Sequence, residues 1–393
     1  MKKINFKDKK TIAIIIAIAV LLITVIVLFA TGTVERLLAE LGVLKIEQVE
    51  PEVTFYQHIP KGDGDVYIIE DHILIADNVG VSCYDTDGTW QWEEEINLKS
   101  PVFIPDGEEG AVLGDIGGNG IYGFDKEGLT FRYVFDTQIV NVSDSVAEKQ
   151  IIVIHSADNY LSAATLVDFS SEVKVVATRK FSQYYMMSAS VSEDGEQVAI
   201  GGIASEGGTT STVIAFMNMK GYELFTTEKI SDEFLPIVSY VDGDNLFAAG
   251  GDHLRRIVKN SVSETDEDVN DMLWDRDGGS NKIVATVKTE DRFITVSTVD
   301  GAETGTEASC TVNIYSSDGS LGDSFNCQGG IKAVKAYGKI ITLYSENEIF
   351  VYNIYGQLIG TFDGVSQISD VEYISEKTLA VCGTSKVAKV DFS

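Results

Sequence analysis

The feature that most constrains the fold of this chain is a unit that recurs eight times after residue 60. Each copy has an apolar strand, a polar turn, a second apolar strand, another turn, and a third strand closing beside Asp or Asn. In most copies a glycine turn and a fourth strand follow. The closing positions are 84, 124, 167, 217, 257, 315, 352 and 390, at intervals of 37 to 58 residues that average about 44. This period is typical of four-stranded propeller blades.

A four-stranded sheet that is apolar on both faces cannot fold alone. Stacking such sheets around an axis buries both faces, and closing the ring leaves only short edges. We therefore predict an all-β domain over residues 61–393, a β-propeller of about eight four-stranded blades. Seven blades remain an alternative because the fifth copy, which ends near Arg256–Val258, is degenerate. An array of β-sandwiches is the competing architecture.

The end of the chain predicts how the ring closes. The last copy stops after its third strand, at Asp391. Its fourth strand must then come from elsewhere, and the free candidate is Val53–Tyr56. That segment lies in a connector, residues 31–60, which begins with apolar residues at helical spacing over 34–41.

Residues 11–30 predict a membrane helix. The run TIAIIIAIAVLLITVIVLFA has no charge, and twenty helical residues span ~30 Å, the thickness of the bilayer core. The preceding residues 1–10 hold five lysines and one aspartate, and such basic flanks stay in the cytoplasm. We expect a single-pass anchor with everything after it outside the cytoplasm. A cleaved signal peptide is the alternative, but its apolar region is normally shorter, about 7–15 residues.

The charge of the chain excludes one class of partner. Lys+Arg is 30 and Asp+Glu is 60, a net charge of −30, so no basic surface for nucleic acid is expected. The segment 264–277 carries seven acids and is interpreted as a solvated insertion, with divalent-cation binding as the alternative. Asp115–Gly120 and Asp275–Gly278 look like calcium loops, but neither completes the pattern, and tight glycine turns explain both.

No catalytic, cofactor-binding or metal-binding residue is predicted. The histidines, thiols and serines lack the spacings of zinc sites and of a G-x-S-x-G elbow, although a triad of distant residues stays open. The tryptophans are expected to pack between blades. The histidines are His58, His72, His155 and His253, and the tryptophans are Trp90, Trp92 and Trp274.

Cys310 and Cys327 are the predicted disulfide. Asp318-Gly319 is a hairpin turn signal, and a two-residue loop there places the two cysteines opposite each other in a non-hydrogen-bonded pair. Cα atoms approach to ~4.5 Å in that class, within disulfide range. Two reduced core thiols are the alternative, because a bulge near Gly322 would shift the register. Cys83 and Cys382 have no such relation and are expected in the core.

The third strand ending in Tyr84-Asp85, the Asp87-Gly88 turn and Trp90 resemble the repeats of quinoprotein-dehydrogenase-like propellers. Those enzymes bind pyrroloquinoline quinone with calcium and typically carry an adjacent cysteine pair. The four cysteines here are far apart, so no cofactor is expected. An amino-terminal anchor before an acidic propeller also resembles a Firmicute family defined only as a domain of unknown function. That resemblance implies a Gram-positive cell surface and supplies no activity.

These features favour a non-enzymatic interaction or scaffold module at the cell envelope, whose partner is a protein or an envelope ligand. Loops on two faces of a rigid ring are where partners bind. The first alternative is an extracytoplasmic hydrolase or lyase that uses the propeller channel. The second is a sensor or assembly factor for another membrane protein. A convergent polar cluster at the channel favours the enzyme, and an apolar patch on one face favours a protein partner.

Overall fold

The computed structural model describes most of residues 48–393. The parts of the chain outside the description are 1–47, 57–63, 107–109, 144–148, 221, 227–229, 232–233, 244, 252, 259–271, 275–280, 290–291, 300–308 and 385. Among the described residues, no helix is long and apolar enough to cross a membrane. The predicted anchor 11–30, the segment 34–41, His58, Asp275–Gly278 and most of the acidic segment 264–277 lie outside them.

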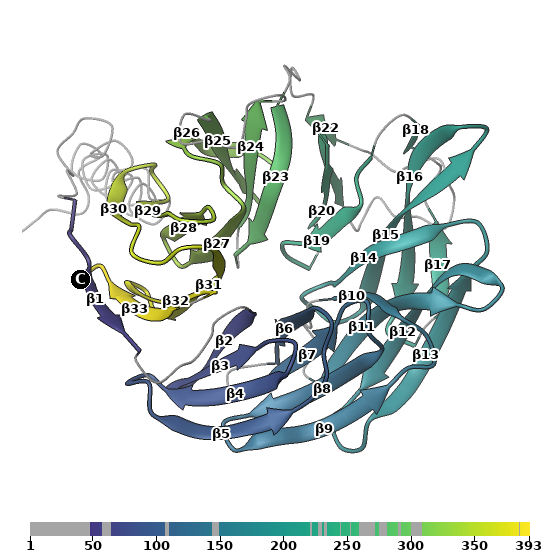
Figure 1. Cartoon of the computed structure of the whole chain (residues 1–393). Coiled ribbons are helices and arrows are strands. Elements are labelled where there is room, and N and C mark those ends of the chain that lie inside the picture. Colours follow the sequence, from purple (N-terminus) through teal and green to yellow (C-terminus); the bar gives the residue numbers. More distant parts are fainter. Residues whose placement is uncertain are drawn as a thin grey trace, which may run out of the picture. The chain divides into compact units, whose positions relative to one another are not determined.

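The described residues form eight antiparallel sheets around a common axis (Figure 1). Blade 1 has β2 (Asp65–Ile69), β3 (His72–Ala76), β4 (Gly80–Asp85) and β5 (Trp90–Glu95). Blade 2 has β6 (Pro101–Pro105), β7 (Ala111–Asp115), β8 (Gly120–Asp125) and β9 (Gly128–Val134). Blade 3 has β10 (Ile139–Val142), β11 (Gln150–Ala157), β12 (Tyr160–Asp168) and β13 (Lys174–Phe181). Blade 4 has β14 (Tyr185–Val191), β15 (Gln197–Glu206), β16 (Thr209–Asn218) and β17 (Glu223–Thr226), and β18 (Ile230–Ser231) also pairs with β16.

The second half of the ring repeats this arrangement. Blade 5 has β19 (Ile237–Tyr240), β20 (Asn245–Gly250), β21 (His253–Val258) and β22 (Met272–Trp274). Blade 6 has β23 (Asn281–Lys288), β24 (Arg292–Val299), β25 (Ser309–Ser316) and β26 (Leu321–Gln328). Blade 7 has β27 (Ala333–Tyr337), β28 (Ile340–Tyr344), β29 (Ile349–Asn353) and β30 (Leu358–Phe362). Blade 8 has β31 (Ile368–Ser375), β32 (Thr378–Gly383), β33 (Lys386–Asp391) and β1 (Glu52–Phe55). The degenerate fifth copy is therefore a blade, and the count of eight is confirmed.

Blade 8 takes its outer strand from the other end of the chain. β1 pairs antiparallel with β33, with Val53 opposite Val390. This is the strand that the truncated last repeat lacks. Just before β1, the Val49 N–H donates to the Ile359 carbonyl of blade 7 at 2.8 Å. The two ends of the described chain thus hold blades 7 and 8 together.

The Asp or Asn that closes the third strand folds the turn after it. In blade 1 the Asp85 carboxylate accepts the N–H groups of Asp87 at 3.0 Å and Thr89 at 2.8 Å. Asn353 does the same in blade 7, for Tyr355 at 3.0 Å and Gln357 at 2.9 Å. Such side-chain bonds satisfy amides that a tight turn leaves unpaired. The repeat's most regular polar residue therefore has a structural role.

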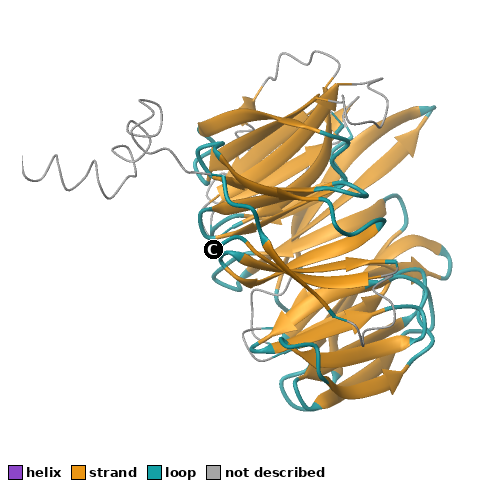
Figure 2. Ribbon diagram, turned by 60° about the vertical axis from the view of Figure 1, so that its left-hand side comes forward, coloured by secondary structure: helices purple, strands orange, loops and turns teal. Residues whose placement is uncertain are grey.

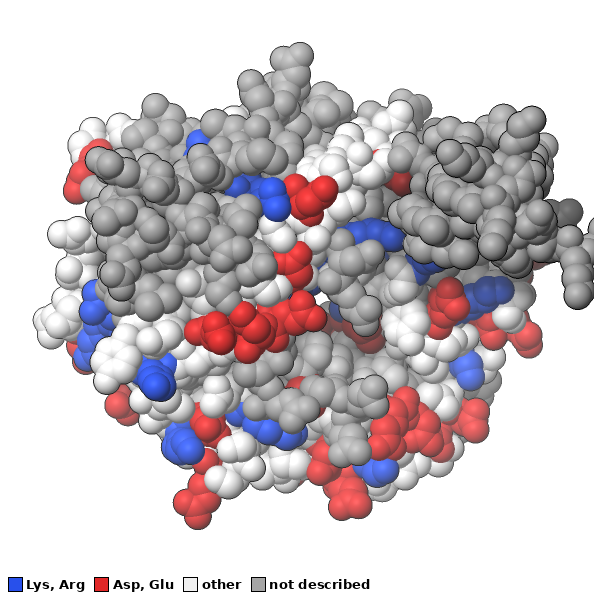
Figure 3. Space-filling view, turned by 180° about the vertical axis from the view of Figure 1, so that it is seen from behind, with Lys and Arg blue, Asp and Glu red and all other residues white. Residues whose placement is uncertain are grey.

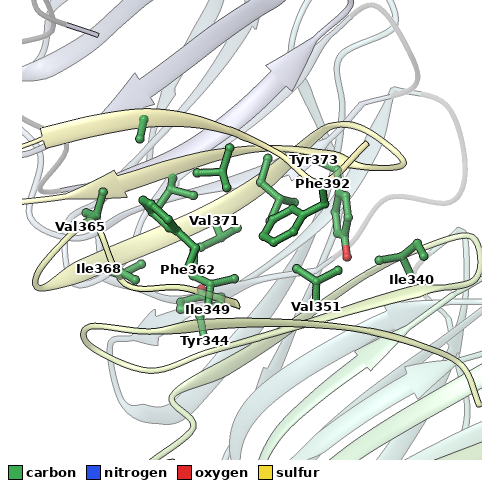
Figure 4. Packing of buried hydrophobic residues seen from close by; sticks show 14 of the residues in the cluster. Ile340, Tyr344, Ile349, Val351, Phe362, Val365, Ile368, Val371, Tyr373 and Phe392 are labelled. Carbon is green, nitrogen blue, oxygen red and sulfur yellow. The ribbon is translucent and has the colours of Figure 1, made fainter. Parts of the chain in front are cut away.

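Apolar side chains fill the spaces between neighbouring blades. Figure 4 shows one such cluster, in which Val351 and Phe362 of blade 7 lie against Val371 and Phe392 of the last blade. Each blade is apolar on both faces, so each contributes to two such layers. Trp92 of blade 1 stacks on Phe124 of blade 2, with ring centroids 5.9 Å apart, as expected for inter-blade packing. Trp90 is 57% exposed, so the expectation of packing is wrong for it, and the Trp274 side chain is not described.

The meander gives the ring two different faces. Strands alternate in direction, so the turns after the first and third strands of every blade lie on one face, here called the turn face. The turns after the second strands and the blade-to-blade connections lie on the opposite face, here called the groove face. The first strands of most neighbouring blades contact one another, which places them around the central channel. Figure 2 shows these loops at the ends of the strands.

Candidate functional site

Side chains of one blade bind the first-strand amides of the next. A first strand pairs on one edge only, so its channel-side N–H groups need other acceptors. Ser188 and Ser190 of blade 4 accept the N–H groups of Val238 at 3.0 Å and Tyr240 at 2.9 Å. Between blades 8, 1 and 2 the acceptors are carboxylates instead of hydroxyls. Those carboxylates belong to the most charged cluster among the described residues of the first strands.

The channel cluster consists of Asp65, Lys335, Asp370 and Glu372. Asp370 accepts the Val66 N–H at 3.2 Å and the Tyr344 hydroxyl at 2.8 Å. The Lys335 Nζ lies 3.4 Å from Asp370 and donates to Glu372 at 2.9 Å. These contacts join the first strands of blades 7, 8 and 1.

Asp65 extends the cluster to blade 2. Its carboxylate accepts the Phe103 N–H, the first-strand amide of the next blade. It also shares a hydrogen bond with the Asp370 carboxyl. One chain of polar contacts therefore crosses four consecutive blades at the place where the ring closes.

Two carboxyl groups in contact cannot both be ionised without cost. Burial, then the charge of Asp370 and its hydrogen bond, raise the pKa of Asp65 well above its ordinary value, although Lys335 and the Phe103 N–H oppose this. Burial lowers the pKa of Lys335, but the charges of Asp370, Glu372 and Asp65 raise it by more. Asp65 is therefore the proton carrier of the pair, and Lys335 stays charged.

The cluster has two possible roles. A raised carboxyl pKa beside a second carboxylate is what general acid–base catalysis requires. However, the Asp370 side chain is only 7% exposed, and its oxygens bind groups of both neighbouring blades, 7 and 1. The contacts of Asp65 and Asp370 are those of ring closure. Figure 3, seen from behind the view of Figure 1, shows acidic and basic side chains interspersed over that face.

Two adjoining hollows lie on the groove face between blades 2 and 3. One has a volume of about 300 Å³ and reaches His155, Thr165 and Thr178. The other, of about 380 Å³, is lined by polar side chains and by Gly117 and Gly118. Asp136 and Thr137, in the connection from β9 to β10, belong to both. We call the pair of hollows the groove.

A chain of hydrogen bonds forms the wall of the first hollow. The Thr137 hydroxyl donates to the Ser156 carbonyl at 2.5 Å, so it cannot also donate to His155 Nδ1, 2.9 Å away. Burial lowers the pKa of His155, which is therefore neutral, with its hydrogen on Nδ1. Its Nε2 then accepts the Thr165 hydroxyl at 2.8 Å, and Thr165 accepts the Thr178 hydroxyl at 2.9 Å.

Of the remaining candidates from the sequence, Asp115 lines the second hollow, whereas His72 and His253 lie elsewhere. Asp115 accepts the backbone N–H groups of Lys99 at 2.7 Å and Ser100 at 3.2 Å, so its carboxylate holds a blade-to-blade connection. His72 lies at the turn face beside Asp71, with 2.8 Å between Nδ1 and the carboxylate. His253 begins β21. Among the described residues no group of three acidic, histidine or cysteine side chains is arranged to hold a metal ion.

The two late cysteines occupy the predicted register. Cys310 lies opposite Cys327 with Cα atoms 5.0 Å apart, and the structure joins their sulfur atoms. The predicted two-residue loop is wrong: the Gly319 N–H donates to the Ser316 carbonyl at 2.8 Å, and the hairpin is one residue longer. A register shift beside Gly322 compensates. Cys83 and Cys382 are free and buried, as expected for core residues. The oxidation state in solution stays a prediction.

The sequence analysis did not single out the channel cluster or the groove. A weak signal existed for the cluster, because the segments AVKAY and ISDVEYIS carry charges inside strands whose two faces pack on other blades. The groove lining comes from five strands and four turns or connections that only the ring brings together, so the candidates Asp115–Gly120 and His155 did not by themselves reveal it.

The comparisons with known proteins identify a fold and a family. BamB from Moraxella catarrhalis is 16% identical, with a TM-score of 0.51 over 87% of this chain and 98% of that one. The Pan2 WD40 domain of Neurospora crassa is 10% identical, with a TM-score of 0.50 over 74% and 88%. At these identities the likeness shows the propeller fold alone. No curated protein matches the sequence. A family of unknown function (DUF5711) matches residues 52–392, which is most of the chain, and the protein belongs to that family.

Proposed function

We propose that this protein is a membrane-anchored, extracytoplasmic interaction module of the cell envelope, without enzymatic activity. The observation that carries the proposal is the groove, two adjoining polar hollows on one face of a closed ring. A rigid scaffold that presents connections around such a hollow is typical of a binding surface. The uncharged run 11–30 and the basic tail before it support the anchor and its direction.

A reporter enzyme fused after Ser393 tests the location. The positive-inside rule places this end outside the cytoplasm, so an alkaline phosphatase fusion should be active and a cytoplasmic reporter inactive. A matched fusion that lacks residues 11–30 should reverse both results. Activity of the cytoplasmic reporter on the full chain would refute the orientation.

A photo-crosslinking amino acid at Gln138, which is exposed on the groove face, tests the interaction. The matched control is Lys377, exposed at a turn-face loop. In intact cells we expect a discrete crosslinked species from position 138 and none from position 377. Equal crosslinking from both positions, or none from either, would contradict a binding surface on the groove face.

The channel cluster favours one second candidate, a hydrolase or lyase in which Asp65 and Asp370 act as acid and base. The raised pKa of Asp65 beside a second carboxyl is the observation that supports it. The two candidates separate in the variants Asp65→Asn and Asp370→Asn. Turnover is the readout that separates them: an enzyme loses turnover in both variants, whereas an interaction module has no turnover to lose, and the persisting crosslink from position 138 shows that each variant is still folded.

A further inference from the structure

We propose that the groove between blades 2 and 3 is a binding site for an uncharged oligosaccharide. This deepens the proposed function by giving the ligand class of the interaction surface. The proposal uses described residues of the ring only, and its test does not depend on where the protein is located.

The hollows have the size of a ligand site and are joined. Their volumes of about 300 Å³ and 380 Å³ lie within the range of small-molecule pockets. Because Asp136 and Thr137 line both, a ligand that fills one hollow can continue into the other. An extended molecule of several similar units fits this arrangement better than a single compact one.

The charges of the lining disfavour an ionic ligand of either sign. The positive charges of Lys99 and Lys180 would repel a cation. The negative charges of Asp115, Asp136 and Asp158 would repel an anion. Two of these charged groups already have partners within the protein. The Lys99 Nζ donates to the Gly117 carbonyl at 2.7 Å, and the Asp115 carboxylate accepts two backbone N–H groups. A neutral ligand avoids the desolvation of an unpaired charge.

The polar groups of the groove match hydroxyls. The direction of the hydrogen-bond chain from Thr178 through Thr165 to His155 leaves Thr178, which lines the hollow, with its free lone pairs as acceptors. The carboxylates of Asp136 and Asp158 also accept, and the amides of Asn97, Asn119 and Gln138 both accept and donate. A hydroxyl group donates and accepts at once, so a polyhydroxylated chain can satisfy all of them.

Apolar surface beside these acceptors fits the C–H face of a sugar ring. Tyr133, Val134, Phe135 and Val175 line the same hollow as Thr178. Ligand pockets commonly combine aromatic surface with a few placed polar groups.

The fold alone does not require a polar residue at the position of His155 in the wall of this hollow. His155 pairs with Ile139, the first residue of the first strand of its blade. The matching positions in blades 1, 5 and 8 are Ala76, Ala249 and Gly383. A blade therefore forms with a small side chain there, and His155 with its threonine partners is specific to blade 3.

The test is binding of defined probes to the purified full chain in lipid nanodiscs, by saturation-transfer NMR and calorimetry. The probes are maltotetraose, cellotetraose and the tetramer of N-acetylglucosamine, with spermidine and citrate as cationic and anionic comparisons. The variants are Thr178→Val, which removes the acceptor and keeps the shape, and Asp136→Asn on an exposed connection. The matched control is Thr361→Val, exposed on β30 of blade 7.

We expect saturable binding of at least one tetrasaccharide, and a five- to tenfold higher Kd in Thr178→Val, the effect of one lost hydrogen bond. Thr361→Val should leave the Kd unchanged. The proposal is overturned if no tetrasaccharide binds at millimolar concentration, if only spermidine or citrate binds, or if both groove variants bind like the control. Absence of sugar binding with a persisting crosslink from position 138 would remove the ligand class and leave the interaction module standing.

Discussion

Single side chains at the ring closure determine how this protein should respond to pH. Asp65 lies against Asp370 with its pKa raised, and Lys335 lies between Asp370 and Glu372. The change of folding stability with pH therefore depends on which of these groups are charged in the folded state.

Asp65→Asn should stabilise the ring increasingly as the pH rises. The folded-state pKa of Asp65 lies above its ordinary 3.8, so its stabilising contribution is complete below that value and is lost as the pH rises through the raised pKa. Asparagine keeps an acceptor for the Phe103 N–H and donates to Asp370 without titrating. The measurement is urea unfolding of both proteins at several pH values between about 4 and 8. A stability difference that is constant, or that shrinks with rising pH, would contradict the assignment.

Lys335→Met should destabilise the protein by about 2 kcal/mol, since it leaves Asp370 and Glu372 without their cation. The figure is below the roughly 3–5 kcal/mol of a fully buried broken pair because the Lys335 side chain is 29% exposed. The control is Lys126→Met, which breaks an exposed pair with Glu70 and should cost less than about 1 kcal/mol. Equal losses in the two variants at neutral pH would show that the channel cluster does not stabilise the ring.

At the scale of elements, the strand pair β1–β33 closes the ring, and the cysteine pair links two strands of blade 6. β1 is the only strand of blade 8 that comes from before blade 1. The hairpin β25–β26 carries the cysteine pair.

Deletion of residues 49–56 should lower the melting temperature of the whole ring. The deletion exposes the edge of β33 and the Ile359 carbonyl that binds Val49. It also removes the Val53 side chain, which packs against the apolar cluster between the last two blades. Circular dichroism of the full chain and of the deletion variant measures the two melting temperatures. Deletion of residues 264–271, a stretch of the acidic segment of the same length, is the control. An unchanged melting temperature after removal of 49–56 would show that the ring closes without β1.

Cys310 and Cys327 should form a disulfide in protein purified under oxidising conditions. Their strands place the Cα atoms 5.0 Å apart, within disulfide geometry. A link across a separation of 17 residues corresponds to about 3 kcal/mol in the chain-entropy model, so the Cys310→Ser, Cys327→Ser double variant should lose about 2–3 kcal/mol. Non-reducing peptide mapping is the direct measurement, and the buried Cys83 and Cys382 should label only after unfolding. Free thiols at both 310 and 327 would end the prediction.

At the scale of the whole molecule, a closed ring explains why so acidic a chain can fold. Acidic side chains at the ends of third strands, such as Asp85 and Asp168, bind backbone amides of the turns that follow, while the layers between blades are apolar. Closure then leaves two faces of different character. The proposed interaction uses the groove face, while the turn face holds the Asp-capped turns.

The sequence by itself determined what is local and periodic. The strand at Val53–Tyr56, the fifth copy near Arg256–Val258 and the Cys310–Cys327 register all follow from repeat length and strand alternation, which are properties of neighbouring residues. The register came out right although the loop was one residue longer, because a bulge beside Gly322 compensated. Only the tertiary structure decided the channel cluster and the groove. Asp65 and Asp370 are 305 residues apart and meet where the ring closes, and the repeat spacing that predicts closure does not say which side chains face each other across it.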